Sequence, residues 1–267
     1  MLIESFQNPK VKLLGKLKNK RARDQTSLFF VEGYREILRL SEGETEIDML
    51  FYCPELFLQD NEKDLIEKVG EKTTQIYRLP KAIFEKISMR DRPDGLALIA
   101  KQKRLGFFEL EEILKNEANP FFCIAESIEK PGNLGSILRS CDAVGINGLI
   151  VCDECTDVYN PNVVRSSVGT LFTVPIFQLT SKETIALLYR YNCAIVTTSP
   201  SAKQNYTDVD YRGAVAIAMG TEQVGLTEQW FNEKFEQVSI PMMGKADSLN
   251  VANATTLLLY EVLRQRR

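Results

Sequence analysis

The chain has 267 residues, of which 44% are hydrophobic, so it can bury one large core or two ordinary ones. Its formal net charge of -3 argues against a protein that coats nucleic acid with its whole surface, although a local basic face fits that balance. The absence of histidine excludes Ser-His-Asp and Cys-His catalysis and any histidine-ligated metal. Catalysis by this chain would therefore use Arg, Lys, Asp, Glu, Ser or Asn.

The chain carries no pattern for export, membrane insertion or metal binding. It lacks a basic segment followed by an apolar one at its start, and it has no apolar run long enough to span a bilayer. Cys152 and Cys155 form a single CxxC without a second pair, and most cysteines stand in apolar contexts. We expect a cytoplasmic protein with structural cysteines, no disulfides and no metal.

The first part of the chain alternates helix and strand patterns. A short amphipathic helix with a basic outer face is predicted within residues 5–23, and a solvated face without a ligand is the alternative. Strands are then predicted at residues 27–31, 48–52, 74–79 and 95–100, and helices at residues 33–40, 55–69 and 81–87. These elements predict a compact α/β domain over residues 1–105. Residues 106–119 are charged and helix-prone and are expected to form a linker.

The second part, residues 120–267, continues this alternation. Asn133 is predicted as the N-cap of a helix that follows a turn at Pro131-Gly132. Strands are predicted at residues 121–125, 148–151, 172–177, 193–198, 215–219 and 238–240, and further helices at residues 160–169, 182–191 and 248–263. Strands separated by helices predict a mostly parallel sheet, whose ligands bind at the carboxyl ends of the strands.

Two glycine-bearing loops follow the last two predicted strands. Gly220 and Gly225 flank Glu222 in the first loop, and residues 240–250 form the second. Glycine permits close backbone approach to a ligand, and a helix that opens just after a strand offers unpaired N–H groups. Neither loop has the spacing of a P-loop or a Rossmann fingerprint, and the chain has no GxSxG elbow. Each loop alone therefore leaves the ligand open.

Taken together, these motifs resemble the SpoU (TrmH) family of RNA 2′-O-ribose methyltransferases. The first family motif resembles residues 126–139, the second residues 219–226 and the third residues 240–251, while Arg165 opens an Arg-Ser segment of the family type. The segment Phe29-Phe-Val-Glu-Gly33 is similar to the substrate-binding domain of rRNA-directed members, a fold like that of a small ribosomal protein. The sequence departs from the family at Ala252-Asn253, where many members carry Ser-Val.

The resemblance implies a SPOUT-type α/β fold whose C-terminal segment is threaded as a deep trefoil knot, preceded by a small α/β domain. It also implies that S-adenosylmethionine binds in the knot. The expected cofactor contacts are Thr198, Gly220, Ile240 and Leu249, chiefly through the backbone. A role in the core is an additional or alternative reading for Ile240 and Leu249.

The resemblance further implies methylation of a ribose 2′-hydroxyl. Arg139 is expected to be essential by orienting the hydroxyl and an adjacent phosphate; its role as the literal base stays open, because a guanidinium keeps its proton in proteins. Asn133 is expected to hold the ribose or Arg139. Glu222 is expected to pair with a cation or a polar substrate group, and a loop-closing acceptor is its alternative role. Ser248 and Asn250 are expected to supply hydrogen bonds.

The expected substrate is structured RNA, with large-subunit rRNA favoured over tRNA. The residues expected to bind RNA are Lys10, Lys18, Lys20, Arg21 and Arg165. By resemblance, the protein is expected to form a homodimer through its catalytic domain. A non-catalytic RNA-binding factor for ribosome assembly is the rival hypothesis, although such a protein would not need Asn133, Arg139, Glu222 and Asn250 together. A nucleotide-binding oxidoreductase lacks its fingerprint.

Overall fold

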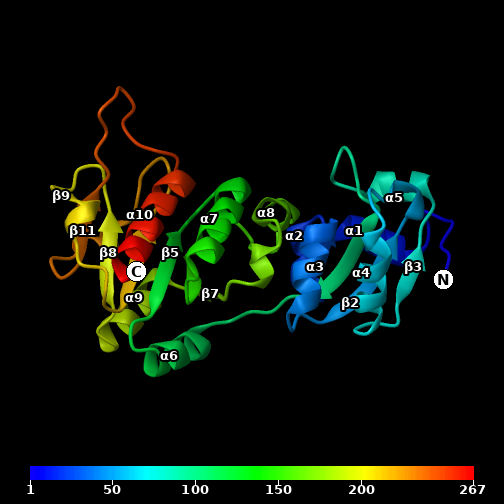
Figure 1. Cartoon of the computed structure of the whole chain (residues 1–267), viewed down its shortest axis with the longest axis horizontal. Coiled ribbons are helices and arrows are strands. Elements are labelled where there is room, and N and C mark those ends of the chain that lie inside the picture. The colour runs from blue at the N-terminus through cyan, green and yellow to red at the C-terminus, as the bar shows by residue number, and fades with distance from the viewer. The chain divides into compact units, whose positions relative to one another are not determined.

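The computed structural model describes all 267 residues, which form two compact units (Figure 1). One unit comprises residues 1–103 and 157–173, and the other comprises residues 104–156 and 174–267. The first unit thus includes a segment from the second half of the sequence. No helix in the chain is both long and apolar enough to cross a membrane. The predicted division into separate domains on either side of residues 106–119 stays a prediction.

A four-stranded sheet lies at the centre of the N-terminal unit. Its order is β1-β4-β2-β3, with antiparallel pairing except between β2 and β3. Buried side chains such as Phe30, Phe51 and Phe84 form the core beside it. The elements are β1 (Leu28–Glu32), β2 (Ile47–Tyr52), β3 (Ile76–Arg78), β4 (Leu96–Lys101), α1 (Pro9–Lys16), α2 (Lys20–Thr26), α3 (Tyr34–Glu42), α4 (Asn61–Gly70), α5 (Lys81–Ile87) and α8 (Pro161–Ser167).

The short amphipathic helix predicted within residues 5–23 is α1, and a turn separates it from α2. Arg23 accounts for this turn. Its guanidinium donates hydrogen bonds to the carbonyls of Leu17 and Lys18 at 2.8 and 2.9 Å and pairs with Asp157 at 2.6 Å. Since these donors satisfy carbonyls at the end of α1, the chain can turn there. Arg23 is 1% exposed and does not belong to the basic outer face.

Two other predicted elements begin later than expected. The helix predicted at residues 55–69 is α4 preceded by a short turn, because the carboxylate of Glu62 accepts hydrogen bonds from the N–H groups of Leu58 and Gln59 at 2.8 and 3.1 Å. These bonds hold the preceding chain in a non-helical conformation. The strand predicted at residues 172–177 begins only with β7, after a 3₁₀ turn.

A seven-stranded sheet forms the C-terminal unit, in the order β7-β6-β5-β10-β8-β11-β9. Every pairing in it is parallel, which confirms the predicted mostly parallel sheet. The short strand β9 was not predicted. The elements are β5 (Phe121–Glu126), β6 (Gly148–Cys152), β7 (Ile176–Leu179), β8 (Ala194–Thr198), β9 (Gln204–Asn205), β10 (Val215–Met219), β11 (Glu236–Ser239), α6 (Phe107–Asn116), α7 (Pro131–Val144), α9 (Ser181–Arg190) and α10 (Val251–Arg266).

Helices cover both faces of this sheet. Leu110 of α6 and Leu187 of α9 pack with Phe122 of β5 in one buried cluster. Helices α7 and α10 lie side by side (Figure 1), and the hydroxyl groups of Ser140 and Thr256 join them at 2.7 Å. Helix α6 falls in the segment expected as a linker and packs on β7 and α9 within this unit. The trefoil knot stays a prediction.

Cys152 and Cys155 have different surroundings. The thiol of Cys152 is buried and lies 3.2 Å from the hydroxyl of Thr184, and burial raises its pKa to about 12. Cys155 is exposed. Cys152 therefore behaves as a small core residue.

Candidate active site

A cavity of about 510 Å³ opens at the carboxyl ends of β8, β10 and β11. Its volume falls within the range of about 300–1,000 Å³ typical of small-molecule sites. These three strands are neighbours in a parallel sheet, so the residues that follow them emerge at one edge. All four residues predicted to contact a cofactor line this cavity, together with two of the predicted catalytic residues; they are Thr198, Gly220, Ile240, Leu249, Glu222 and Ser248.

Gly220 begins the loop that forms one wall of the cavity. The loop closes on itself through paired hydrogen bonds between the backbone groups of Thr221 and Gly225, at 3.0 and 3.1 Å. A Cβ atom on Gly220 would lie 2.2 Å from the carbonyl carbon of Gly225 and 2.3 Å from the nitrogen of Leu226. Gly225 itself has a φ of 72°, which favours glycine. The two glycines are therefore needed for different reasons, one for space and one for backbone conformation.

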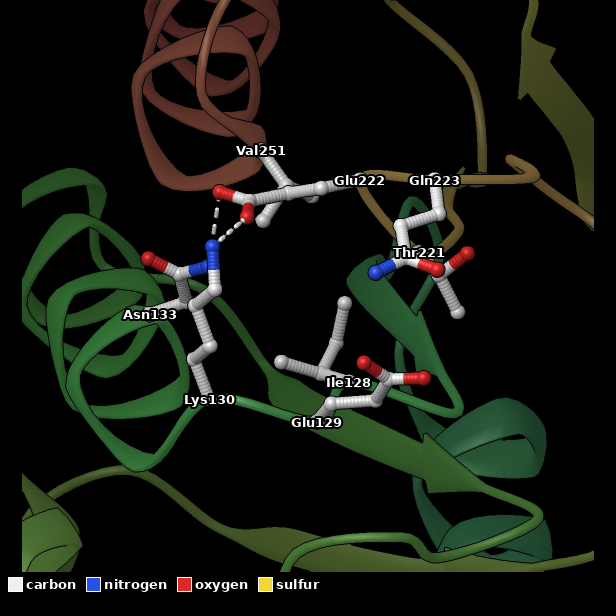
Figure 2. Close-up of a pocket in the computed structure, with 8 residues that line it drawn as sticks. All are labelled: Ile128, Glu129, Lys130, Asn133, Thr221, Glu222, Gln223 and Val251. Atoms are coloured by element: carbon white, nitrogen blue, oxygen red, sulfur yellow. Dashed lines mark hydrogen bonds and ion pairs between the residues drawn. The ribbon is translucent and has the colours of Figure 1, made fainter.

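Glu222 lies at the centre of a polar cluster beside the cavity (Figure 2). One carboxylate oxygen accepts hydrogen bonds from the side-chain amides of Asn133, at 3.0 Å, and Asn250. The other oxygen pairs with the ammonium of Lys130. The amide of Asn250 also donates to the side-chain oxygen of Asn133 at 3.2 Å. Three of the five predicted catalytic residues are thus in direct contact.

The Glu222 carboxyl is held in its charged form. The hydrogen bond from the Lys130 ammonium, followed by that from Asn133, lowers its pKa below the usual range. Glu222 lines both the large cavity and the small pocket that holds Lys130 and Asn133. The site therefore presents a fixed anionic hydrogen-bond acceptor at the boundary between the two.

Lys130 was not singled out from the sequence. It stands in the first motif, and the prediction that Glu222 would pair with a cation was the only signal for it. The cation turns out to come from the protein's own chain, 92 residues away. The Lys130 side chain stays 68% exposed, so it is accessible to a second partner.

The prediction that Asn133 caps its helix is wrong. Helix α7 begins at Pro131, with Lys130 in the capping position, so Asn133 lies within the first turn. Proline is favoured at the first helical position because its fixed φ suits the helix and its missing N–H would be unpaired there anyway. The amide of Asn133 is consequently available to Glu222.

Asn250 is the residue that does cap a helix. Its side-chain oxygen accepts a hydrogen bond from the N–H of Ala252 at 3.0 Å, and α10 begins at Val251. The helix predicted from residue 248 therefore starts later, and Ser248 remains in the loop that lines the cavity. The capping bond fixes Asn250 while its amide nitrogen donates to Glu222.

Arg139 is not part of this cluster. It lies six residues beyond Asn133 on α7, a rotation of about 240° around the helix axis at 3.6 residues per turn. Its side chain is exposed, makes no hydrogen bond or ion pair, and does not line the cavity. Arg139 therefore contributes little to holding the fold together.

The predicted RNA-binding residues of α1 and α2 differ in their surroundings. Lys10 lies over the ring of Tyr77, 4.9 Å from its centre, and Lys20 pairs with Asp24 at 3.0 Å. Arg21 is exposed and makes no hydrogen bond or ion pair. Of these three cations, Arg21 is the one without a partner in the chain.

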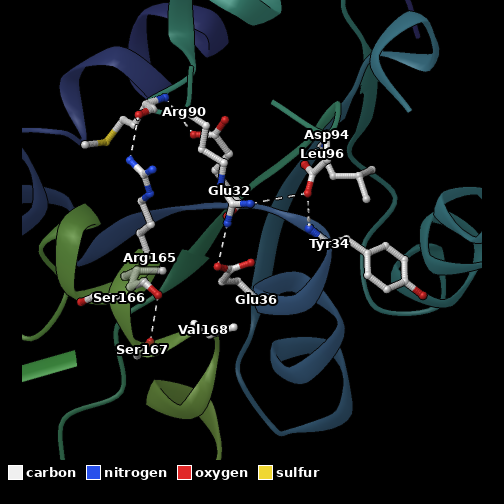
Figure 3. A network of polar contacts seen from close by, with 12 residues as sticks. Glu32, Tyr34, Glu36, Arg90, Asp94, Leu96, Arg165, Ser166, Ser167 and Val168 are labelled. Carbon is white, nitrogen blue, oxygen red and sulfur yellow. Dashed lines mark hydrogen bonds and ion pairs between the residues drawn. The ribbon is translucent and has the colours of Figure 1, made fainter. Parts of the chain in front are cut away.

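Lys18 and Arg165 converge on one loop of the N-terminal unit. Lys18 donates to the carbonyl of Ser88 and Arg165 to that of Met89, both at 3.3 Å. Burial lowers the pKa of the Lys18 ammonium. Figure 3 shows the same loop tied down through Arg90, which pairs with Glu36 at 2.7 Å. The structure thus brings two cations from distant parts of the sequence, Lys18 and Arg165, to the same loop.

The chain matches known families on both sides of residue 100. Residues 120–260 match the SpoU rRNA Methylase family, and residues 8–98 match the MRM3-like substrate binding domain. The chain belongs to the SpoU rRNA methylase family. The resemblances found in the sequence, to SpoU proteins and to the N-terminal substrate-binding domain of rRNA-directed members, are thereby confirmed.

Individual SpoU proteins are similar over nearly the whole chain. A 23S rRNA (uridine(2479)-2′-O)-methyltransferase from Streptomyces viridochromogenes is 32% identical over 94% of this chain and 87% of its own length. Among solved structures, an AdoMet-bound rRNA methyltransferase from Sinorhizobium meliloti has a TM-score of 0.88 and 28% identity, covering 99% of this chain and 97% of its own.

A second solved structure is the SpoU methyltransferase AviRb from Streptomyces viridochromogenes with the cofactor AdoMet. It has a TM-score of 0.85 and 28% identity, covering 97% of this chain and 99% of its own. These similarities confirm the predicted SPOUT-type α/β class of the fold.

Proposed function

We propose that this protein transfers a methyl group from S-adenosylmethionine to a ribose 2′-hydroxyl of 23S rRNA. The observation that carries the proposal is the cavity at the carboxyl ends of β8, β10 and β11, which all four predicted cofactor residues line. Family membership and the two AdoMet-bound SpoU structures support it. The relative from Streptomyces viridochromogenes is named for methylation of 23S rRNA.

The residues around the cavity fit this cofactor. Gly220 leaves no room for a side chain, so the loop backbone forms the wall, while Ile240, Leu249 and Phe231 offer apolar surface for an adenine ring. Thr198 and Ser248 supply hydroxyl groups. When bound, S-adenosylmethionine would supply an electrophilic methyl carbon, which would bond to the ribose oxygen as its bond to sulfur breaks and the hydroxyl loses its proton. Binding of S-adenosylmethionine by the full chain, measured by equilibrium dialysis, tests this part directly; no binding would contradict it.

The protein's own contribution is to position the ribose. Glu222 accepts a hydrogen bond from the ribose, while Asn133 and Asn250 keep the carboxylate in place. Arg139 orients the hydroxyl through an adjacent phosphate. Holding the reacting groups in line is the main source of rate enhancement for such a displacement, since little charge has to be created.

Lys130→Met is expected to move the acid limb of the pH–rate profile to higher pH. The ammonium of Lys130 is the main cause of the low pKa of Glu222, so its loss lets the carboxyl take up a proton at a higher pH. Activity needs the carboxylate. As pH falls, the variant would therefore lose activity at a higher pH than the wild type does. The measurement is kcat/KM for RNA from about pH 4 to 8. Lys182→Met, an exposed lysine of α9, serves as the control. An acid limb that stays in place would contradict the role of Lys130.

Arg139→Ala is expected to lower methylation by about 100-fold or more without changing the temperature of unfolding. The side chain has no partner in the chain, so its removal costs the fold little, and any loss of activity reports on substrate. Arg139→Lys should restore little, since an ammonium cannot reproduce the planar, two-pronged contact of a guanidinium. Full methylation by the alanine variant would show that Arg139 has no role in the mechanism.

We further propose that residues 1–105 and Arg165 hold the RNA, with residues 106–119 as the connection to the methyltransferase domain at residues 120–267. The matching substrate-binding family and the exposed cations support this. Arg21→Ala should weaken RNA binding and reduce the slope of log affinity against log salt by about 1, because one phosphate contact is lost. Arg190→Ala, in an ion pair with Glu111, should leave the slope unchanged. A wild-type slope in the Arg21 variant would mean that the RNA does not contact Arg21.

We also propose that the protein acts as a cytoplasmic homodimer joined through the C-terminal unit. Leu257 and Tyr260 support this proposal, because these large side chains of α10 are 40% and 48% exposed. Exposed apolar side chains on one helix are typical of an association surface. Sedimentation of the full chain tests it: a monomer at working concentrations would contradict the proposal.

A further inference from the structure

Glu126 is a buried carboxylate that the proposed mechanism does not use. It is the last residue of β5 and is 1% exposed. Its oxygens accept hydrogen bonds from the N–H of Thr227 at 2.8 Å and from the hydroxyl of Thr227 at 2.6 Å. Longer contacts come from the hydroxyl of Ser181 at 3.1 Å and the amide of Gln229 at 3.4 Å. None of these partners is a cation.

A buried charge without a cation is costly unless its hydrogen bonds are good ones. Ser181 cannot be the main donor, because its single hydroxyl hydrogen is also within reach of Asp153, at the shorter distance of 2.6 Å. The firm donors to Glu126 are therefore the two groups of Thr227. The contact that this carboxylate stabilises is the one between the end of β5 and Thr227.

Thr227 ends the loop that forms the cavity wall. The start of that loop is fixed at Gly220, which packs directly on the backbone of Gly225. Its far end is fixed where Thr227 binds Glu126. Between these two points lie Glu222 and much of the cavity lining. The conformation of residues 220–227 thus depends on the position in which Glu126 holds Thr227.

We propose that Glu126 is a positioning residue that sets the conformation of the loop over residues 220–227, and thereby the affinity for S-adenosylmethionine. The inference rests on the proposed function. Trp230, which follows this loop, is fully buried in the core. Because Trp230 anchors the chain independently, loss of Glu126 releases the loop without unfolding the sheet.

The test measures S-adenosylmethionine affinity and steady-state kinetics of the full chain. Glu126→Ala should weaken binding by about tenfold or more, the loss expected when a hydrogen bond to a charged group is removed. Its KM for S-adenosylmethionine should rise, while RNA binding stays unchanged, because in the proposed function residues 1–105 and Arg165 hold the RNA. Glu126→Gln should bind within about threefold of wild type: its carbonyl still accepts from the Thr227 N–H, and the hydroxyl can rotate to accept from its amide.

Glu62→Gln is the matched control. Glu62 is a buried carboxylate, as Glu126 is, but it lies in the N-terminal unit. It accepts hydrogen bonds from two backbone N–H groups. The variant should unfold at a lower temperature and keep wild-type affinity for S-adenosylmethionine. If Glu126→Ala does not fold, Thr227→Val, which removes one donor and keeps the other, should weaken binding by about threefold or more.

The outcomes separate the inference from the function it rests on. If the wild-type chain does not bind S-adenosylmethionine, the proposed function fails. If the wild type binds and Glu126→Ala or, should that variant be unfolded, Thr227→Val binds equally well, the positioning role of Glu126 is overturned. If Glu126→Gln is as weak as Glu126→Ala, the negative charge rather than the hydrogen-bond geometry is responsible, and positioning is again overturned.

Discussion

Gly220→Ala is expected to weaken binding of S-adenosylmethionine strongly and, with it, to slow methyl transfer. The added Cβ would lie 2.2 Å from a backbone carbon of Gly225, and backbone atoms in a closed loop cannot move aside as a flexible side chain can. Overpacking of this kind costs about 1–3 kcal/mol, equivalent to a loss of affinity of about five- to 150-fold once the loop opens to relieve it. Calorimetric titration of the full chain provides the measurement.

Gly213→Ala is the control for this variant. Gly213 also belongs to the C-terminal unit, but a Cβ there meets nothing within 4 Å. It should bind the cofactor as the wild type does. Wild-type affinity in Gly220→Ala would mean that the cofactor does not use this loop.

Glu222→Gln is expected to reduce the methylation rate by about 100-fold or more. The carboxamide keeps the size of the side chain but cannot pair with the ammonium of Lys130 or accept at both of its polar atoms. Asn133 would then lose the bond that holds its amide, whereas Asn250 would keep its capping bond to Ala252. Since Glu222 lies in an exposed loop, the temperature of unfolding should change little. Single-turnover methylation with saturating cofactor isolates the effect.

Glu228→Gln provides the comparison, since Glu228 is a nearby exposed carboxylate without a hydrogen bond or ion pair. It should methylate at the wild-type rate. Equal rates for the Glu222 and Glu228 variants would leave Glu222 with the loop-closing role alone.

The sequence was sufficient to predict the parallel sheet and the edge at which its cavity lies. Thr198 ends β8, Gly220 directly follows β10, and Ile240 ends a predicted strand and directly follows β11. In a parallel sheet such positions gather at one edge, whatever the strand order. For this reason the residues chosen for the cofactor line one cavity, although their roles in binding stay predictions.

Contacts between distant residues could not be predicted in the same way. Lys130 pairs with Glu222 and Glu126 binds Thr227, but in the sequence each is only a charged residue near a strand end. Arg23 lies in the segment predicted to carry a basic outer face, whereas its side chain is buried and pairs with Asp157. Burial and pairing depend on segments more than 90 residues apart, and periodicity carries no information at that range.

Local competition explains the misplaced helix starts. Asn133 and Pro131 are both good residues for the start of a helix, and the fixed φ of proline prevails. At α10, two polar residues could cap the helix, Ser248 and Asn250, and the structure uses Asn250. In both cases the shift matters for the site, because it directs an asparagine amide at Glu222.

Ribose methylation of 23S rRNA tests the central proposal most directly. Ribosomal RNA from a strain lacking the protein, incubated with the purified chain and S-adenosylmethionine, is mapped for 2′-O-methylated nucleotides. The proposal predicts one defined new 2′-O-methyl group in 23S rRNA, absent without the protein and lost with Glu222→Gln. A chain that binds the RNA without methylating it, or that methylates only tRNA, would contradict the proposal.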